Sequence, residues 1–483
     1  MSLFLGVDIG TSSSKGVVVD AYGKVIGSAV REHGVDRPRP GHAEMDGEIW
    51  WDEFVSLATE LTEGITVDAV GVSGMGPCVL LTDAFGTPLR KAILYGVDTR
   101  ATAQIAALTA ELGGADAIRE RCGSALSSQA AGPKLAWIAE HEPAVAARAR
   151  RLFMPASWLA YRLTGAYVLD YHSASQCTPL FDTHALDWYS PWASRIAPDL
   201  ELPPLAWPGD VAGTTTRALA GIPAGTPVIT GTIDAWTEAV SVGAQNPGDL
   251  MLMYGTTMFL IATVDRLVTS PSMWGTVGAF PGTRNLAGGM ATSGAVTGWL
   301  RDLTDGSFVD LLAEAEASGP GARGLLMLPY FAGERTPVMD PDARGVVAGL
   351  TLSHTRGDLY RAALEATALG VRHNLEFLPD VRRVVAVGGG TRGGLWTRIV
   401  SDVTGRAQEV PRVTIGAAFG AAYLAGLTRG PADIAAWNPI AETVEPDPST
   451  KDGYDELYAL YRDLYPATRA IAHSLANRQR RTP

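Results

Sequence analysis

The N-terminal stretch LGVDIGTSSSKGVVVD, residues 5–20, combines one acidic residue with a tight turn of small and hydroxyl-bearing residues. The acid is Asp8, and the turn residues that could contact a ligand are Gly10, Thr11, Ser12, Ser13 and Lys15. Glycine lets the backbone approach a ligand closely, and consecutive amides and hydroxyls can bind phosphate oxygens. A carboxylate next to a phosphate is repulsive unless a divalent cation lies between them, so Asp8 predicts a magnesium site. The alternative, in which Asp8 only caps the turn, stays open on this segment alone.

Two later segments also offer backbone and hydroxyl groups to a nucleotide. Thr256 and Thr257 follow Gly255 between two apolar runs, which gives a second hydroxyl-bearing turn. The sequence GGGTRGG, residues 388–394, would let a base and a ribose lie against bare backbone, although a helix-packing turn explains such a cluster equally well. The sequence has neither G-x-x-x-x-G-K-[ST] nor a strand-linked G-x-G-x-x-G, so a Walker-type or dinucleotide-binding loop is not expected.

The segment VITGTIDAWTEAVSVG, residues 228–243, contains a candidate general base. An apolar run is followed by Asp234 at the start of an expected helix. Aspartate at a helix start is often only an N-cap. The functional interpretation is that its carboxylate accepts the proton of an alcohol that attacks a phosphoryl group, because such an alcohol has a high pKa.

Length and composition describe an ordinary globular chain. With 483 residues the chain exceeds what a single hydrophobic core usually organises, so two large domains are expected. The net charge of −12 argues against a nucleic-acid partner, and the three cysteines are too far apart for a zinc or disulfide framework. No run approaches the roughly 20 apolar residues of a membrane span, so we expect a cytoplasmic protein without a membrane partner. The oligomeric state stays open, and a homodimer is compatible with the sequence.

Short β-branched runs alternate with helical patterns along the chain, which predicts an α/β fold. Apolar strands flank a Gly-Thr turn both at residues 3–20 and at residues 250–264, which suggests a duplicated unit. The Asn-Pro-Gly sequence at residues 246–248 predicts a domain boundary near residue 248. Helices are expected over residues 157–164, 358–378 and 455–478.

With these residues assembled, the chain resembles the FGGY family of carbohydrate kinases from residue 3 to about residue 428. The motif DIGTSSSK is similar to the family's first phosphate turn, and AGPKLAWIAEHEP is similar to its first signature, except that Ala131 stands where Pro, Ser or Thr is usual. The segment GVVAGLTLSHTRGDLYRAALE, residues 345–365, matches the second signature throughout. The motif LPYFAGERTP is similar to the pentulose kinase branch, and to xylulose kinases in particular.

The resemblance implies an α/β fold of two ribonuclease-H-like domains, as in actin, that flank a central cleft for ATP and a sugar. Residues 1–247 would form the N-terminal domain, with the sugar site, the first phosphate turn and the catalytic aspartate, and residues 248–483 the nucleotide-binding domain. The implied enzyme transfers the γ-phosphate of Mg-ATP to a hydroxyl of a small ketose, with D-xylulose as the best choice. The alternatives are another ketose or a polyol, such as ribulose, erythritol or glycerol, and a non-kinase actin-like ATPase.

The resemblance also implies a role for each matching residue. Asp234 corresponds to the catalytic base, and Asp8 corresponds to the residue that holds Mg²⁺. Phosphate contacts are implied for Thr11, Ser12, Ser13, Lys15, Thr256, Gly294 and Gly298. Adenosine contacts are implied for Gly389, Gly390, Thr391 and Gly394. Sugar contacts are implied for Met75, Gly76, Asp98, Arg100 and Asp234.

Two segments depart from the family pattern where the sugar would be recognised. After GVSG, xylulose kinases usually continue with Gln-Met-His and glycerol kinases have an Arg-Glu pair nearby, whereas this chain reads MGPC at residues 75–78. The segment YGVDTRA, residues 95–101, is one residue longer than the usual Trp-x-Asp-x-Arg. The sequence therefore leaves the identity of the sugar and of its phosphorylated hydroxyl open.

Overall fold

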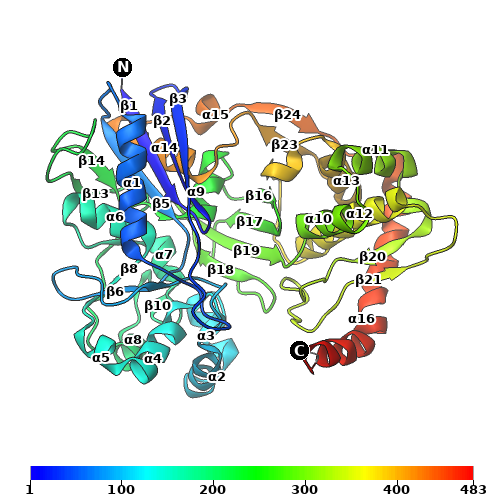
Figure 1. Cartoon of the computed structure of the whole chain (residues 1–483), viewed down its shortest axis with the longest axis horizontal. Helices are drawn as coiled ribbons and strands as arrows, with labels where there is room; N and C mark the ends of the chain where they lie inside the picture. The colour runs from blue at the N-terminus through cyan, green and yellow to red at the C-terminus, as the bar shows by residue number, and fades with distance from the viewer. Residues whose placement is uncertain (1, 482–483) are drawn as a thin grey trace. The chain divides into compact units, whose positions relative to one another are not determined.

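The computed structural model describes residues 2–481 and divides them into two compact units (Figure 1). The first unit consists of residues 1–247, 263–285 and 415–439, and the second consists of residues 248–262, 286–414 and 440–483. The described residues form two large mixed β-sheets, one built from the first unit and one mostly from the second, with helices packed against them. Within the described residues, no helix is both long enough and apolar enough to cross a membrane.

The first unit is built on a sheet with the strand order β13-β14-β5-β1-β2-β3, and β15 pairs with β5 beside this path. The first three strands form an antiparallel meander because Gly and Asp turns separate their apolar runs. Strand β5 then pairs with β1 in parallel. The strand bounds are β1 Leu3–Ile9, β2 Ser13–Asp20, β3 Val25–Glu32, β5 Ala69–Gly74, β13 Val211–Thr214, β14 Pro227–Ile229 and β15 Thr232–Ile233.

Helices cover both faces of this sheet. Helix α1 (Gly47–Leu61) packs on β2 and β3 at the front of Figure 1, while α14 (Ala417–Gly426) packs behind β1 and β5. A Cβ atom at Gly6 would lie 2.0 Å from the carbonyl oxygen of Ala418, and one at Gly71 would lie 1.9 Å from that of Ala421. Glycine at these strand positions is therefore required for the close approach of α14. The apolar side chains on the α1 side include Trp50, Phe54 and Trp158.

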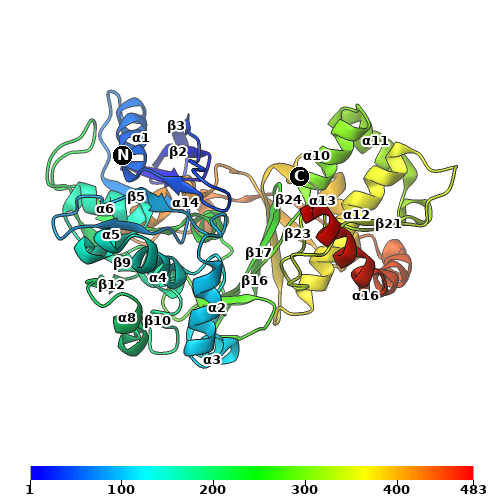
Figure 2. The ribbon, with the colours of Figure 1, turned by 60° about the horizontal axis from the view of Figure 1, so that its bottom comes forward.

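Smaller elements complete the first unit, and Figure 2 brings its helices α2–α5 and α8 toward the viewer. Helix α6 (Pro155–Thr164) ends at Gly165, whose φ of 78° provides the left-handed C-cap, so the helix expected there is confirmed. The other helices are α2 Thr102–Glu111, α3 Ala115–Cys122, α4 Ala131–His141, α5 Pro143–Arg148, α7 Tyr171–Ser175, α8 Ser190–Ile196, α9 Asp234–Ser241 and α15 Ile434–Trp437. The short strands are β4 Glu44–Met45, β6 Leu80–Thr82, β7 Ala92–Ile93, β8 Arg151–Phe153, β9 Leu169–Asp170, β10 Phe181–Asp182, β11 Asp187–Trp188 and β12 Leu205–Ala206.

The second large sheet has the strand order β18-β19-β17-β16-β22-β23-β24. Its central hairpin, β16 with β17, is antiparallel, and β16 also pairs in parallel with the later strand β22. The hairpin of β1 and β2 with the parallel strand β5 has the same arrangement, so the duplication suggested by the sequence is visible in the topology. The bounds are β16 Asp249–Tyr254, β17 Met258–Val264, β18 Trp274–Val277, β19 Arg284–Met290, β22 Arg383–Val387, β23 Gln408–Pro411 and β24 Ile440–Val444.

Long helices accompany the sheet in the second unit. Helix α12 (Arg356–Leu375) begins at a capping box formed by Thr355 and Asp358, and α16 (Lys451–Arg481) contains the other long helix that the sequence predicts. Both expected helices are confirmed, with ends that differ by a few residues. The remaining elements are α10 Gly294–Leu303, α11 Phe308–Ser318, α13 Leu395–Thr404, β20 Leu326–Leu328 and β21 Val346–Ala348.

Candidate active site

In the first unit, three parallel strands end at the same edge of the sheet. Strand β5 pairs in parallel with β1 and with β15, so that Gly74 lies beside Ile9 and beside Ile233. The residues that follow these strands, which include Met75 and Asp234, therefore emerge together. The crevice at the carboxyl ends of parallel strands is the usual ligand site of open α/β sheets.

Asp8 and Asp234 share this edge although they are far apart in the sequence. Burial raises the pKa of the Asp8 carboxyl well above its usual range, and the negative charge of Asp234 raises it further. Burial also raises the pKa of Asp234, while the backbone N–H of Ala235 donates a hydrogen bond of 2.8 Å to Asp234 Oδ1 and opposes that shift. Carboxyls whose pKa values burial raises, one of them raised further by the charge of the other, are typical of functional sites.

A third acidic residue, Glu238, belongs to this cluster and was not predicted from the sequence. It lies one helical turn after Asp234 on α9, and burial raises its pKa to about 7. The charge of Lys15 lowers this pKa, and the charge of Asp234 raises it. Gly416, whose φ of 89° favours glycine, passes close to this carboxylate, since a Cβ atom there would lie 2.7 Å from Glu238 Oε2. The i, i+4 spacing of Asp234 and Glu238 is the sequence signal that would have found it.

Asp8 has the properties that a bound Mg²⁺ requires of a ligand. Its side chain is buried, with 8% of the residue exposed, and its Oδ1 has no hydrogen-bond partner among the described residues. A buried carboxylate oxygen without a partner is costly unless something absent from the chain satisfies it. Within residues 2–481 no group of three or more His, Cys, Asp or Glu side chains could hold a metal ion. Mg²⁺ commonly uses only one or two carboxylates together with waters and substrate phosphates.

The turn after β1 is held by its own backbone and by a histidine. The N–H of Gly10 donates to the carbonyl of Ser13 at 3.0 Å, and Nε2 of His33 lies 3.0 Å from the carbonyl oxygen of Gly10. Nδ1 of the same ring lies 2.9 Å from a carboxylate oxygen of Glu53. The hydroxyl of Thr11 hydrogen-bonds the hydroxyl of Tyr95 at 2.8 Å. The remaining predicted phosphate residues of this turn, Ser12, Ser13 and Lys15, are half-buried or exposed.

Met75 and Gly76 lie against the strand that delivers Asp234. The N–H of Met75 donates to the carbonyl of Ile9 at 2.7 Å, and the Met75 side chain is buried. A Cβ atom at Gly76 would lie 2.6 Å from Cγ1 of Ile233. Cys78 is also fully buried. This segment therefore offers shape and apolar surface next to Asp234, and its buried side chains carry no charge.

Asp98 and Arg100, which the sequence assigns to the sugar, are engaged with protein partners. Their side chains are only 0% and 1% exposed, and their closest atoms are 2.7 Å apart. Asp98 also accepts a 2.6 Å hydrogen bond from the N–H of Ala43, and Arg100 forms a second ion pair of 2.7 Å with Glu44. The Arg100 guanidinium lies 4.8 Å from the centre of the Trp137 ring. These contacts give both residues structural partners, and a contact of either residue with the sugar stays a prediction.

The Arg100→Ala substitution is expected to destabilise the protein by about 3–5 kcal/mol, because it leaves buried carboxylates without their counter-charge. The expected result is a lower urea midpoint, with a KM for the sugar that changes little in the protein that remains folded. A variant with unchanged stability and a sugar KM raised many-fold would instead support direct sugar binding by this residue.

In the second unit, the residues that are predicted to contact phosphates lie at the turn after β16 and at the start of α10. The backbone N–H groups of Ser293 and Ala295 both donate to the carbonyl of Thr256 at 3.1 Å. The N–H of Gly294 donates to the carbonyl of Gly255 at 3.0 Å, and a Cβ atom at Gly294 would lie 2.6 Å from that oxygen. The start of α10 is thus docked on the Gly-Thr turn. One turn later, a Cβ atom at Gly298 would meet open space.

The glycine-rich turn after β22 lies beside the same segment because β22 pairs in parallel with β16. Gly388 has a φ of 96°, and a Cβ atom there would lie 2.4 Å from the carbonyl oxygen of Tyr254. A Cβ atom at Gly390 would lie 2.7 Å from the Trp396 ring, whereas Gly389 and Gly394 face open space. The Thr391 hydroxyl donates to the carbonyl of Gly388 at 2.9 Å. The structure thereby brings Thr256, Gly294 and this turn together within the second unit.

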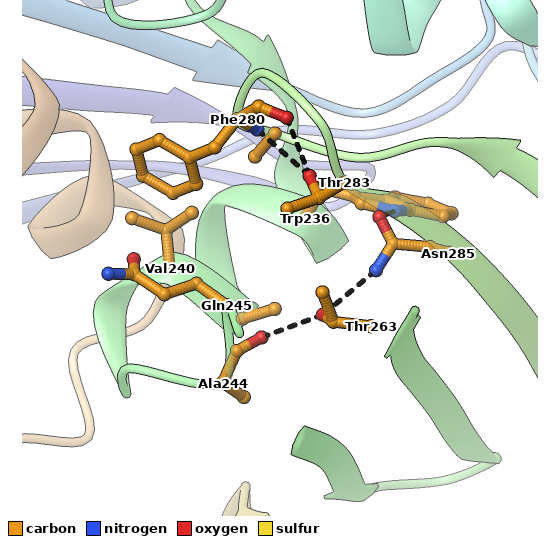
Figure 3. Close-up of a pocket in the computed structure, with 10 residues that line it drawn as sticks. Trp236, Val240, Ala244, Gln245, Thr263, Phe280, Thr283 and Asn285 are labelled. Atoms are coloured by element: carbon orange, nitrogen blue, oxygen red, sulfur yellow. Dashed lines mark hydrogen bonds between the residues drawn. The ribbon is translucent and has the colours of Figure 1, made fainter. Parts of the chain in front are cut away.

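A small cavity lies on the side of α9 that carries Trp236 (Figure 3). Trp236 Nε1 donates to Asn285 Oδ1 at 3.1 Å, Asn285 Nδ2 donates to the Thr263 hydroxyl at 3.0 Å, and that hydroxyl donates to the carbonyl of Ala244 at 3.2 Å. The volume open to the centre of a water molecule is about 10 Å³, enough for about one water. The cavity is therefore too small for a sugar, and the hydrogen-bond chain anchors the helix that begins with Asp234.

Comparison with known proteins assigns the chain to one family, because both halves of the chain match models of that family. The model of the FGGY family of carbohydrate kinases, N-terminal domain, matches residues 3–241, and that of the C-terminal domain matches residues 250–428. The chain is 33% identical to a xylulose kinase of Streptomyces rubiginosus, over 93% of this chain and 94% of the relative. It is 32% identical to a glycerol kinase of Symbiobacterium thermophilum, over 88% of this chain and 89% of that relative. A solved xylulose kinase from Rhodospirillum rubrum matches with a TM-score of 0.91 and 32% identity, over 98% of this chain and 100% of that one.

Proposed function

Because this chain belongs to the FGGY family of carbohydrate kinases and is an ATP-dependent sugar kinase, we propose that its acceptor is a ketopentose, with D-xylulose as the first choice. The xylulose kinases among its relatives, alike over nearly the full length, support this choice. Another ketose or a polyol is the second candidate, because a glycerol kinase is almost as similar and the Met75–Cys78 segment lacks charged side chains.

The observation that carries the proposal is the pair of carboxyls with raised pKa values, the buried Asp8 and the half-buried Asp234, at the edge where β1, β5 and β15 end. Asp234 is the general base in this scheme: its carboxylate accepts the proton of the sugar hydroxyl as that oxygen attacks the γ-phosphoryl group. Burial makes this carboxylate a stronger base than one in water, since its proton affinity is raised. Met75 and Gly76 bound the sugar on its apolar side.

The remaining roles concern the nucleotide. Asp8 would hold Mg²⁺, and the bound Mg²⁺ would neutralise the negative charge of the ATP phosphates. Residues of the first unit would orient the phosphates through hydroxyls, amides and one ammonium group, namely Thr11, Ser12, Ser13 and Lys15. Residues of the second unit would contact the phosphates and adenosine, namely Thr256, Gly294, Gly298, Gly389, Gly390, Thr391 and Gly394. In this assignment the N-terminal domain, residues 1–247, binds the sugar, and the C-terminal domain, residues 248–483, binds the nucleotide.

The experiment that tests the proposal is a coupled assay for ADP over ketopentoses, ketohexoses, tetritols and glycerol, with the phosphorylated product identified by mass spectrometry. We expect the highest kcat/KM with D-xylulose and a sugar phosphate equimolar with ADP. A higher value with another ketose or a polyol would identify the second candidate. ATP turnover that yields inorganic phosphate, and that no sugar stimulates, would contradict a sugar kinase of either kind.

The rate is expected to depend on pH through Asp234. A general base works only when it is deprotonated, so kcat/KM for the sugar should fall as the pH drops through the raised pKa of this carboxyl. The fall of kcat/KM on the acidic side should therefore occur above about pH 4, where an ordinary aspartate titrates. A rate profile measured at saturating ATP and Mg²⁺ checks this expectation. A profile that stays flat down to about pH 4 would speak against the role.

The location and assembly of the protein remain predictions from its sequence. A cytoplasmic enzyme fits the activity, since ATP and small sugars are its substrates. The homodimer is the oligomeric state to test by light scattering.

A further inference from the structure

Asp170 joins two elements of the first unit, namely the strand that leads to Asp234 and the start of helix α7. Its Oδ1 atom accepts a hydrogen bond of 2.6 Å from the Thr232 hydroxyl and one of 3.0 Å from the N–H of Ser173. The second of these bonds caps α7 at its N-terminus. Asp170 and Thr232 are both buried, and 62 positions of sequence separate them. The Asp170 side chain therefore fixes β15 to an element that lies outside its sheet.

Helix α7 is itself held by further contacts. Nδ1 of His172 lies 2.7 Å from the carbonyl oxygen of Val277, and the N–H of Val277 donates to the Ser175 hydroxyl at 3.2 Å. Burial lowers the pKa of His172 to about 3, so the ring is neutral and donates its one N–H proton to that carbonyl. The His172 ring also contacts the Trp236 ring of α9, with the two ring centres 3.9 Å apart. Asp170 thus connects Thr232 to a fixed support.

The residue directly before Asp234 is held by a second set of hydroxyls. The Thr237 hydroxyl donates to the carbonyl of Ile233 at 3.1 Å, and the Ser73 hydroxyl donates to the Thr237 hydroxyl at 3.1 Å. Strand β15 has only two residues, so its pairing with β5 supplies few backbone restraints. Side-chain hydrogen bonds therefore supply much of what fixes the chain that carries Asp234, and the bond to Asp170 is the one that involves neither the sheet nor α9.

We propose that Asp170 is a positioning residue for the base: by holding the Thr232 hydroxyl, it places the Asp234 carboxylate where the sugar hydroxyl reacts. This inference rests on the proposed function and adds a residue that acts on the base without touching the substrate. A general base must lie within hydrogen-bond reach, about 2.6–3.2 Å, of the group whose proton it accepts. A misplacement of about 1 Å can cost a factor of about 10² in rate.

Asp170 acts on Asp234 through geometry and not through its charge. Burial and the N–H of Ala235 account for the pKa of Asp234, and the charge of Asp170 does not contribute to that shift. An uncharged side chain that accepts the same two hydrogen bonds should therefore serve as well as the carboxylate. Asparagine at residue 170 meets this condition, because its amide oxygen is an acceptor.

The test removes the hydroxyl that Asp170 holds and keeps the branched shape of the side chain, in the variant Thr232→Val. The coupled ADP assay measures kcat and KM for the best acceptor from the substrate screen. We expect kcat to fall about 10–100-fold, the scale of a misplaced catalytic group. The KM for the acceptor should change less than threefold, as should the dissociation constant of the non-hydrolysable ATP analogue adenylyl imidodiphosphate with Mg²⁺. Thr232→Ser restores the donor and should keep kcat within threefold of the wild-type value.

Two further variants separate geometry from charge and from stability. Asp170→Asn keeps the acceptor without the charge, and its kcat should stay within threefold of the wild-type value. Thr183→Val is the matched control, because Thr183 is a buried threonine of the same unit whose hydroxyl donates to the carbonyl of Cys122 at 2.9 Å. It should lower the urea midpoint about as much as Thr232→Val does, and its kcat should equal that of the wild-type protein.

Each remaining outcome overturns the inference in a recognisable way. A wild-type kcat in Thr232→Val would show that the bond to Asp170 does not position the base, while the sugar kinase proposal stays intact. Equal losses of kcat in Thr232→Val and Thr183→Val would reduce the bond to a contribution to stability. A loss in Asp170→Asn as large as that in Thr232→Val would mean that the charge acts instead of the geometry. A screen in which no sugar or polyol is phosphorylated would overturn the proposed function first, and this inference with it.

Discussion

The Asp234→Asn variant will turn over its sugar about 10²–10⁴-fold more slowly than the wild-type protein, the range that a general base contributes. The amide has nearly the same shape as the carboxylate but cannot accept the proton of the attacking hydroxyl. The loss should appear in kcat, measured with the coupled ADP assay at saturating sugar. The dissociation constant of the non-hydrolysable ATP analogue adenylyl imidodiphosphate should change less than twofold, because the proposed base acts on the acceptor and makes no contact with the nucleotide.

A control for this variant is Asp52→Asn, which removes an exposed carboxylate of the same unit on α1. Its kcat should equal that of the wild-type protein. If Asp234→Asn weakened nucleotide binding by the same factor as it lowered kcat, the residue would be a nucleotide ligand, and the assignment as base would be wrong. A kcat within threefold of wild type would also reject it.

The Asp8→Asn variant should need about 10–100-fold more Mg²⁺ for half-maximal rate, the range that the loss of even an outer-shell partner costs a metal site. The buried oxygen Oδ1, which has no hydrogen-bond partner among the described residues, is the atom expected to face the cation or its water shell. The measurement is a titration of initial rate with Mg²⁺ at fixed, saturating ATP and sugar.

Glu238→Gln is the matched comparison for Asp8→Asn, because it removes one negative charge from the same cluster. If Asp8 is the ligand, the Mg²⁺ requirement should rise much more in Asp8→Asn than in Glu238→Gln. Equal shifts in the two variants would mean that Asp8 acts only through its charge. Unchanged Mg²⁺ curves for Asp8→Asn would remove the cation from this position altogether.

The sequence predicted those features that depend on neighbouring residues. The Gly-Thr turns after β1 and β16 and the helix that ends at Gly165 all follow from local patterns of apolar residues, glycine and capping groups. Chain length predicted two domains, and the alternation of strand and helix patterns predicted an α/β fold. The ribonuclease-H-like fold of both domains came from the resemblance of whole motifs to a family. The meeting of Asp8 with Asp234 also depended on that resemblance, since no local pattern reports that β15 pairs with β5.

What the sequence did not predict depends on contacts between distant segments. Sugar contacts of Asp98 and Arg100 stay a prediction, but no local pattern showed that Glu44 and the amide of Ala43, from another part of the chain, would bind these side chains. Glu238 was overlooked because a glutamate within a helix is usually a solvated residue. The segment around Gly416, which passes close to this carboxylate, comes almost 180 residues later in the sequence.

The packing of α14 on the first sheet bears on how the protein is made. Residues 415–439 are synthesised after most of the second unit, yet they supply the helix that lies on Gly6 and Gly71. A ribosome that has made only residues 1–247 has therefore produced a sheet with one apolar side still exposed to water. Completion of the first unit must wait for the last quarter of translation, and a polypeptide cut after residue 247 should be captured by chaperones or aggregate rather than form an independent domain.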